Sequence, residues 1–119
     1  MTTQGPFPHF HVDTASYDPL PDFGGSQSVL YSSPDGRRLA GTFKESGVHT
    51  MLMPFDEFVY VIAGTAKVSV DGGETVELGP GSCCWVFEGT EVTWDFSEDF
   101  HDVSVLVSDT RFDISPEGD

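Results

Sequence analysis

The chain consists of short apolar segments that are separated by turn residues at regular intervals, and no apolar stripe recurs at helical spacing. Turn signatures such as Pro34-Asp35-Gly36 and Asp71-Gly72-Gly73 stand between the segments. Pro presets φ for a turn and Gly accepts φ above zero, so these residues end one strand and allow the chain to reverse into the next. Several short strands at this spacing predict an all-β sandwich or barrel.

Three regions of the chain differ in composition. Residues 1–27 are rich in Pro, Gly, Ser and Asp, and they predict an extended N-terminal arm with one short strand at residues 10–12. Residues 28–110 hold the regular alternation of strands and turns, and residues 111–119 form a polar C-terminal tail. A chain of 119 residues fits one domain of ordinary size around one core.

Acidic residues dominate the charge balance, with 20 Asp and Glu against five Lys and Arg and a formal net charge of −15. Nucleic acids and anionic membrane surfaces are bound through clustered Lys and Arg, so we expect neither as a partner. No apolar run reaches the length of a membrane helix, and residues 1–6 show no secretory signal pattern. The two cysteines, Cys83 and Cys84, are adjacent and predict no disulfide framework. We therefore expect a cytoplasmic protein.

Two segments carry a family resemblance. Phe55–Gly64 resembles the first cupin motif, in which a Glu is followed by six residues and then Gly, here Glu57 and Gly64. Gly79–Gly89 resembles the second motif, a Gly-rich turn, a short apolar strand and a turn that ends in Gly. Over residues 28–108 the chain is similar to small single-domain cupins of the ethanolamine-utilisation and ureidoglycine-aminohydrolase type. The resemblance implies a cupin double-stranded β-helix, which is a jelly-roll barrel, and a homodimer.

The chain departs from the metal-binding pattern of many cupins. Those proteins hold a metal through two His at alternate positions before the Glu and a third His after the second motif. Here the sequence before Glu57 reads Thr50-Met51-Leu52-Met53, and Val92 and Thr93 stand after the second motif. We therefore predict no metal ligands and no cofactor. The alternative is a divalent metal bound through Glu57, His49 or His11.

Glu57 and His49 are the candidate catalytic residues. The resemblance implies that Glu57 points into the barrel, where a carboxylate without a nearby cation has a raised pKa and can serve as a general acid or base. The structural alternative is a carboxylate that only braces a strand. His49 shares a strand face with Met51 and Met53, because side chains alternate with period two, and could pair with Glu57. Its structural alternative is a strand-end histidine in solvent.

The candidate substrate-binding residues are soft or aromatic side chains that could line the barrel. They are Met51, Met53, Tyr60, Trp85, Phe87 and Trp94. None of the five Lys and Arg is clearly aimed into the barrel, whereas phosphates and dicarboxylates need such a cation. We therefore predict a small-molecule substrate that is neutral or cationic and fairly apolar.

These residues lead to one preferred function and two alternatives. The preferred function is a metal-independent enzyme that uses acid–base chemistry, of isomerase, dehydratase, cyclase or lyase type. One alternative is a non-catalytic small-molecule-binding or structural cupin in which Glu57 only supports the barrel. The other is a metal-dependent cupin enzyme with an atypical ligand set.

Overall fold

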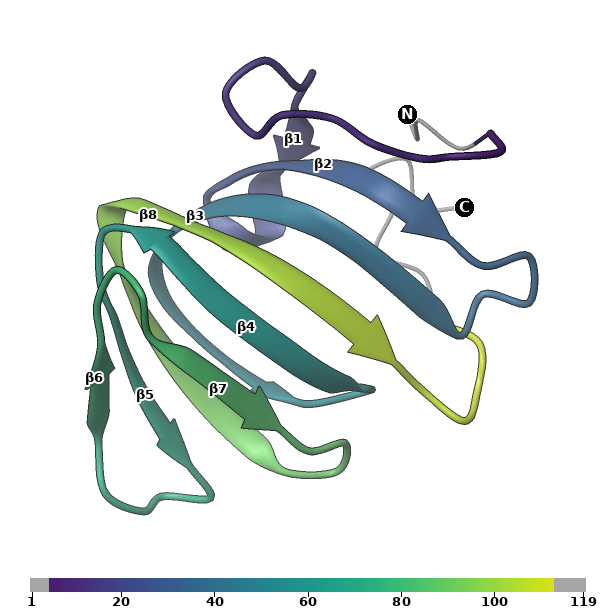
Figure 1. Cartoon of the computed structure of the whole chain (residues 1–119). Coiled ribbons are helices and arrows are strands. Elements are labelled where there is room, and N and C mark those ends of the chain that lie inside the picture. Colours follow the sequence, from purple (N-terminus) through teal and green to yellow (C-terminus); the bar gives the residue numbers. More distant parts are fainter. Residues whose placement is uncertain (1–4, 113–119) are drawn as a thin grey trace.

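The protein is built almost entirely from antiparallel strands, two of which are much longer than the rest (Figure 1). The computed structural model describes residues 5–112. In chain order the elements are β1 (Asp18–Leu20), the 3-10 turn η1 (Pro21–Phe23), β2 (Gly25–Ser32), β3 (Arg38–Leu52), β4 (Asp56–Ala63), β5 (Ala66–Val70), β6 (Val76–Leu78), β7 (Cys83–Val86) and β8 (Glu91–Val107). The predicted all-β class is confirmed. Within residues 5–112 no helix has the length and apolar character needed to cross a membrane.

The long strands β3 and β8 belong to two sheets at once. Residues 38–45 of β3 pair with residues 100–107 of β8, and this half continues into β2 and β1 on one side and β4 and β7 on the other. Residues 47–52 of β3 pair with residues 91–96 of β8, which continue into β5 and β6. The register shifts at Gly47, whose φ of 87° allows the bend between the two halves. Two sheets that share two bent strands make the predicted jelly roll.

The glycine of the first motif has a steric reason to be there. Gly64 has a φ of 72° at the turn between β4 and β5, a conformation that side chains disfavour. A Cβ at this position would lie 2.6 Å from the Cα of Phe100 on β8. The motif spacing therefore fixes where β4 leaves its neighbour β8, seven residues after Glu57.

The core lies between the two sheets and follows the period-two alternation of the strands. Val59 and Val61 of β4 and Trp94, Phe96 and Phe100 of β8 are all buried. Trp94 and Phe96 stack with their ring centroids 5.6 Å apart, and Phe96 contacts Phe100 at 4.6 Å. These aromatic contacts fill one end of the barrel and leave a cavity beside it.

The N-terminal arm is ordered differently from the expectation. The strand predicted at residues 10–12 does not form; the arm instead forms β1, and β2 already begins within it at Gly25. The Tyr17 hydroxyl donates to the Val12 carbonyl at 2.7 Å and lies 3.0 Å from Nε2 of His101 on β8. The Lys44 ammonium lies 4.3 Å from the centroid of the Tyr17 ring. These contacts hold the arm against the sheet.

Only the start of the predicted tail can be described. The Phe112 amide donates to the Gly36 carbonyl at 2.9 Å, and the Phe112 ring packs against Phe55 with centroids 4.9 Å apart. Residues 113–119 of the predicted tail lie outside the described residues.

Candidate active site

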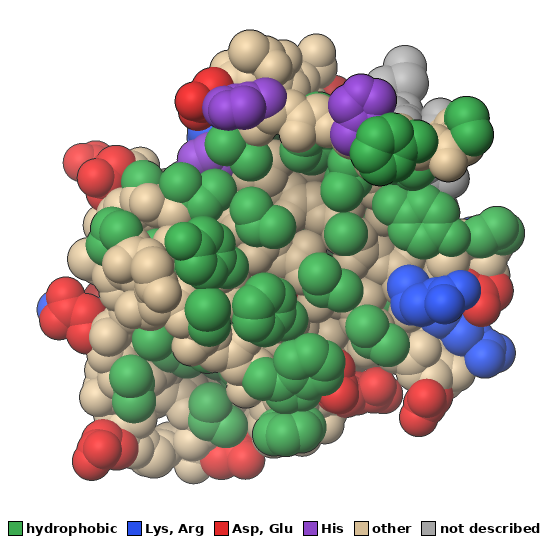
Figure 2. All heavy atoms as spheres, in the orientation of Figure 1, with side chains coloured by type: hydrophobic (Ala, Val, Ile, Leu, Met, Phe, Trp, Pro, Cys, Tyr) green, Lys and Arg blue, Asp and Glu red, His purple; other side chains and the backbone are tan. Residues whose placement is uncertain are grey.

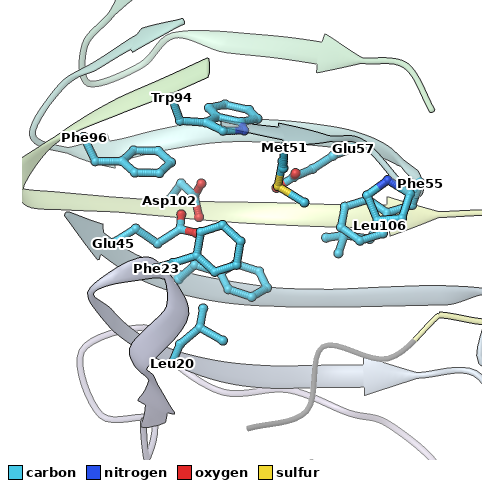
Figure 3. Close-up of a pocket in the computed structure, with 12 residues that line it drawn as sticks. Leu20, Phe23, Glu45, Met51, Phe55, Glu57, Trp94, Phe96, Asp102 and Leu106 are labelled. Carbon is cyan, nitrogen blue, oxygen red and sulfur yellow. The ribbon is translucent and has the colours of Figure 1, made fainter. Parts of the chain in front are cut away.

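A cavity of about 230 Å³ lies between the two sheets, and the turn η1 of the arm contributes to one of its walls. Its apolar lining residues are Leu20, Phe23, Phe43, Met51, Pro54, Phe55, Trp94, Phe96 and Leu106. The remaining lining residues are three acids, Glu45, Glu57 and Asp102. Figure 3 shows Trp94 and Phe96 on one side of this space and Phe23 and Leu20 on the other, with the carboxyl groups between them.

The three acids come from neighbouring strands. Asp102 of β8 pairs with Phe43 of β3, and Glu45 stands two residues further along β3 on the same face. Glu57 of β4 pairs with Leu106 of β8, which lies on the face of Asp102. The antiparallel register of β3, β8 and β4 therefore gathers residues that are far apart in sequence. In Figure 3 the carboxyl groups of Glu45 and Asp102 lie next to each other, and Glu57 lies beyond them, beside Met51.

Asp102 is the most deeply buried of the three acids, with 2% of its surface exposed. Its Oδ1 atom is buried and has no hydrogen-bond partner within the described residues. Burial is the main cause that raises the pKa of Asp102 well above its usual range, and the negative charges of Glu45 and Glu57 raise it further. The nearby Ser104 hydroxyl acts in the opposite direction. Burial and the two neighbouring charges therefore disfavour the ionised form of Asp102.

The pKa values of Glu57 and Glu45 are raised as well. Burial raises the pKa of Glu57 to about 7, and the Ser104 hydroxyl limits the rise. Burial first, and then the charge of Glu57, raises the pKa of Glu45. Three carboxyls that share a cavity of low polarity cannot all ionise cheaply, so protons remain among them near neutral pH.

No cation compensates these acids. The five Lys and Arg all fall within the described residues, and none of them lines the cavity. Lys44 instead lies over Tyr17. Within residues 5–112 no three His, Cys, Asp or Glu side chains are grouped so that they could hold a metal ion. The site is thus acidic and apolar at the same time.

His49 lies next to the cavity without lining it. Its Nε2 donates to the Ser46 carbonyl at 2.7 Å, and its ring contacts Phe23 at 5.2 Å and Phe96 at 6.0 Å between centroids. His49 therefore packs against two aromatic side chains that line the cavity, Phe23 and Phe96. His11, the other histidine considered, is exposed in the arm, where its Nδ1 accepts from the Asp13 amide at 3.1 Å.

The structure separates the predicted substrate-binding residues into three groups. Met51 and Trp94 line the cavity with Glu57, and Met53 is buried but is not part of the lining. Tyr60 and Trp85 point away from the cavity, on the opposite side of β4 and β7 from Glu57 and Val86. Phe87 directly follows β7 and is 62% exposed. These three aromatic residues are therefore not brought together with Glu57.

Glu45 and Asp102 are site residues that the sequence reasoning did not single out. A signal for each was present, because both continue an inward-facing alternation: Leu39, Gly41 and Phe43 lead to Glu45, and Phe100 and Asp102 lead to Ser104 and Leu106. Burying a carboxylate at an inward position of a strand costs folding free energy, so such a residue is seldom there without a role. An acid at an inward position is therefore the pattern that identifies Glu45 and Asp102.

The neighbouring cysteines differ in their surroundings. Cys83 is exposed, whereas Cys84 is partly buried, and both are free thiols. Burial raises the pKa of Cys84 to about 11, with Glu57 and Asp102 as further causes. Cys84 therefore stays a neutral thiol beside the acids and is no nucleophile at neutral pH.

Comparison with known proteins agrees with the motifs and the topology. Residues 32–101, which are more than half of the chain, match the family described as the EutQ-like cupin domain. No curated protein sequence matches the chain significantly.

Three solved structures illustrate the fold relationship. KdgF from Halomonas sp. is 20% identical with a TM-score of 0.67, and the match covers 82% of this chain and 92% of KdgF. The EutQ protein of Clostridium difficile is 22% identical with a TM-score of 0.60, over 73% of this chain and 64% of that one. The DMSP lyase DddQ from Ruegeria pomeroyi is 14% identical with a TM-score of 0.63, over 85% of this chain and 60% of that one. At these identities the likeness shows the fold alone.

Proposed function

Because the chain belongs to the EutQ-like cupin domain family, we propose that its barrel cavity receives a small organic molecule on which Glu57 acts by proton transfer. The observation that carries this proposal is the surroundings of Glu57. Burial raises the pKa of this carboxyl to about 7, so both of its protonation states are populated near neutral pH. A general acid or base works best when its pKa lies near the operating pH.

Glu45 and Asp102 give the proposed site a second proton-bearing group. Their pKa values are raised too, and each is increased by a neighbouring negative charge. In the proposed reaction Glu57 takes a proton from a carbon of the substrate, and the Glu45–Asp102 pair supplies a proton to another atom of the same molecule. A proton removed at one atom and delivered at another describes isomerisation, and delivery to a leaving oxygen describes dehydration. One fold neighbour is described as a lyase, so this fold carries elimination chemistry in another protein.

The experiment that tests this proposal follows isotope exchange by proton NMR. The protein is incubated in D₂O with a panel of small, compact molecules that carry an acidic C–H bond next to a hydroxyl or amino group. We expect the natural protein to exchange or eliminate at one of them and the Glu57→Gln variant to lose this activity. The matched control is Glu77→Gln, which removes an exposed acid of β6 far from the cavity lining. Tight binding of panel molecules without any exchange would instead favour a binding domain.

A separate surface feature concerns the predicted homodimer. The side of β8, β4 and β7 turned away from the cavity, which we name the outer face, is apolar (Figure 2). Its residues are Phe58, Tyr60, Cys83, Trp85, Val103, Val105 and Val107. Trp85 remains 46% exposed. Monomeric proteins rarely expose contiguous apolar patches of this kind without a partner.

We propose that a second copy of this chain covers the outer face. The middle of this face carries no acid although the net charge of the chain is −15, so two copies can approach there without bringing their acids together. Next to Val107, the exposed Arg38 and the acids Asp56 and Asp109 form a rim of mixed charge. In a two-fold interface each surface meets a copy of itself, and a rim with both signs can pair with its own copy.

The dimer proposal predicts a change in mass in solution. We expect light scattering to report a dimer for the natural protein and a monomer for Val105→Glu, because the new charge would be buried in the centre of the interface. The control is Val76→Glu on β6, which adds the same charge at a similarly exposed valine outside the outer face. A natural protein that is monomeric at all concentrations would contradict the proposal, as would a dimer that survives Val105→Glu.

A further inference from the structure

The cavity combines three acids with no cation and with mostly aromatic walls. Glu45, Glu57 and Asp102 line it, and every Lys and Arg of the chain lies elsewhere. Asp102 contributes a second and independent observation, because it is only 2% exposed and its buried Oδ1 has no hydrogen-bond partner within the described residues. A buried acceptor without a partner is costly, and a ligand that donates a hydrogen bond would remove that cost.

The walls of the cavity suit a positive charge as well. The indole of Trp94 and the ring of Phe96 stack at an interplanar angle of 15° and form one wall, while Phe23 faces them from the arm (Figure 3). Aromatic faces attract cations, and Trp does so most strongly. Glu45 and Asp102 lie between these walls. A cation in the cavity would therefore meet aromatic rings and carboxyl groups at once.

We propose that the ligand of this cavity is a small organic ammonium ion with a compact apolar body, whose N–H group donates to Oδ1 of Asp102. The proposal rests on the cavity of the proposed function and names the class of molecule that enters it. A volume of about 230 Å³ corresponds to the space of about eight waters, which accommodates a compact amine. An anion would face three acids without a single compensating cation.

A bare metal cation fits the same surroundings less well. Hard divalent cations take six or more oxygen ligands in a tight shell, whereas no three acids, His or Cys within residues 5–112 are grouped around one point. The apolar residues, which make up most of the lining, also offer no ligand atoms to a bare ion. An ammonium ion with an apolar body uses both parts of the cavity.

Ammonium binding should be linked to proton release. The cation favours the ionised form of the carboxyls, whose pKa values are raised in the empty site. Near pH 7 the site holds protons that the bound cation displaces, so affinity should increase as the pH rises from 6 to 8. At lower pH more of the carboxyls carry a proton before the cation binds, so the advantage of the positive charge should shrink.

The test compares three probes that share one apolar body: neopentylammonium, neopentyl alcohol and pivalate, measured by calorimetry on the full chain. At pH 8 we expect the ammonium probe to bind at least about tenfold more tightly than the alcohol, and pivalate to bind worst. Repeating the pH 7 titration in buffers of different ionisation enthalpy should show proton release for the ammonium probe only. Asp102→Asn should weaken ammonium binding about tenfold and leave alcohol binding unchanged.

The controls separate this inference from the proposed function. Glu77→Gln on the exposed β6 should leave the affinities of all three probes as they are. Alcohol or pivalate binding as tightly as the ammonium probe would overturn the inference, and so would ammonium affinity that does not respond to Asp102→Asn. In either case, loss of isotope exchange in Glu57→Gln on a neutral substrate would leave the proposed function standing. If the protein instead selects the ammonium probe but shows no proton transfer on any substrate, this inference would stand and the proposed function would fail.

Discussion

The Asp102→Asn variant is expected to be more thermostable than the natural protein at pH 8 and nearly unchanged at pH 3.5. In the folded chain the pKa of Asp102 is raised well above its ordinary value of 3.8, chiefly by burial. The folded state therefore holds a proton that the unfolded chain releases once the pH exceeds about 4. The stability from this carboxyl is full below that pH and is lost as the pH rises through the folded-state pKa.

The size of the effect follows from this linkage. Each unit of pKa difference is worth about 1.4 kcal/mol, and about 1 kcal/mol moves the melting temperature of a domain of this size by about 4 °C. We therefore expect Asp102→Asn to raise the melting temperature by at least about 5 °C at pH 8. At pH 3.5 the unfolded chain also keeps most of this proton, and the protonated acid and the amide have nearly the same shape and polarity, so little should change.

The matched control is Asp95→Asn, which removes an exposed acid from the same strand. This change relieves only surface repulsion and should shift the melting temperature by less than about 2 °C. Scanning calorimetry at both pH values separates the two variants. A lower melting temperature for Asp102→Asn at pH 8, or an equal shift at pH 3.5 and pH 8, would show that the charge of Asp102 is not costly in the folded protein.

Loss of the Glu57 carboxyl is expected to have the largest effect on activity. A positioned acid or base contributes about 10²–10⁴-fold to a rate, so Glu57→Gln should reduce kcat by that factor while the protein stays folded. The amide keeps the size of the side chain and removes an ionisation that is costly in the cavity. We therefore expect the melting temperature of the variant at pH 8 to equal or exceed that of the natural protein.

The pH profile should show which group acts as base. With Glu57 as base, kcat/KM rises as the pH passes about 7, where this carboxyl ionises. The same rate should fall again above about pH 8, where Glu45 gives up its proton and the pair can no longer act as an acid. Glu45→Gln should remove the fall and keep the rise. A profile that is flat between pH 6 and 9 would assign proton transfer to neither group.

Much of the fold follows from local signals. Turn residues such as those at Pro34–Gly36 and Asp71–Gly73 locate the reversals of the chain, because Gly accepts backbone conformations that other residues avoid. The spacing from Glu57 to Gly64 also identifies β4 and the turn that follows it. The arm was harder to predict, because its strand β1 forms only by pairing with β2 and its contacts depend on Tyr17 and His101, which are 84 residues apart.

The candidate site was predictable only in part, for two different reasons. Glu45 and Asp102 meet Glu57 through the register of β3, β8 and β4, and pairing between distant strands leaves no local trace in a sequence. The aromatic residues illustrate the other reason, because residue type suggested that Tyr60 lines the cavity although its odd spacing from Glu57 places it on the opposite side of β4. The alternation of side chains along a strand therefore indicates which residues line the cavity better than residue type does.

Glu57 lies in a cavity whose burial brings the ionisation of its carboxyl close to neutral pH. Carboxyl carbon NMR of the labelled protein follows this group directly, and the signal that disappears in Glu57→Gln identifies it. We predict a titration midpoint near pH 7 for this signal, far above the ordinary range of a glutamate carboxyl. A midpoint below pH 5 would contradict a proton-transfer role for Glu57, because its side chain would then be permanently ionised and have no proton to exchange near neutral pH.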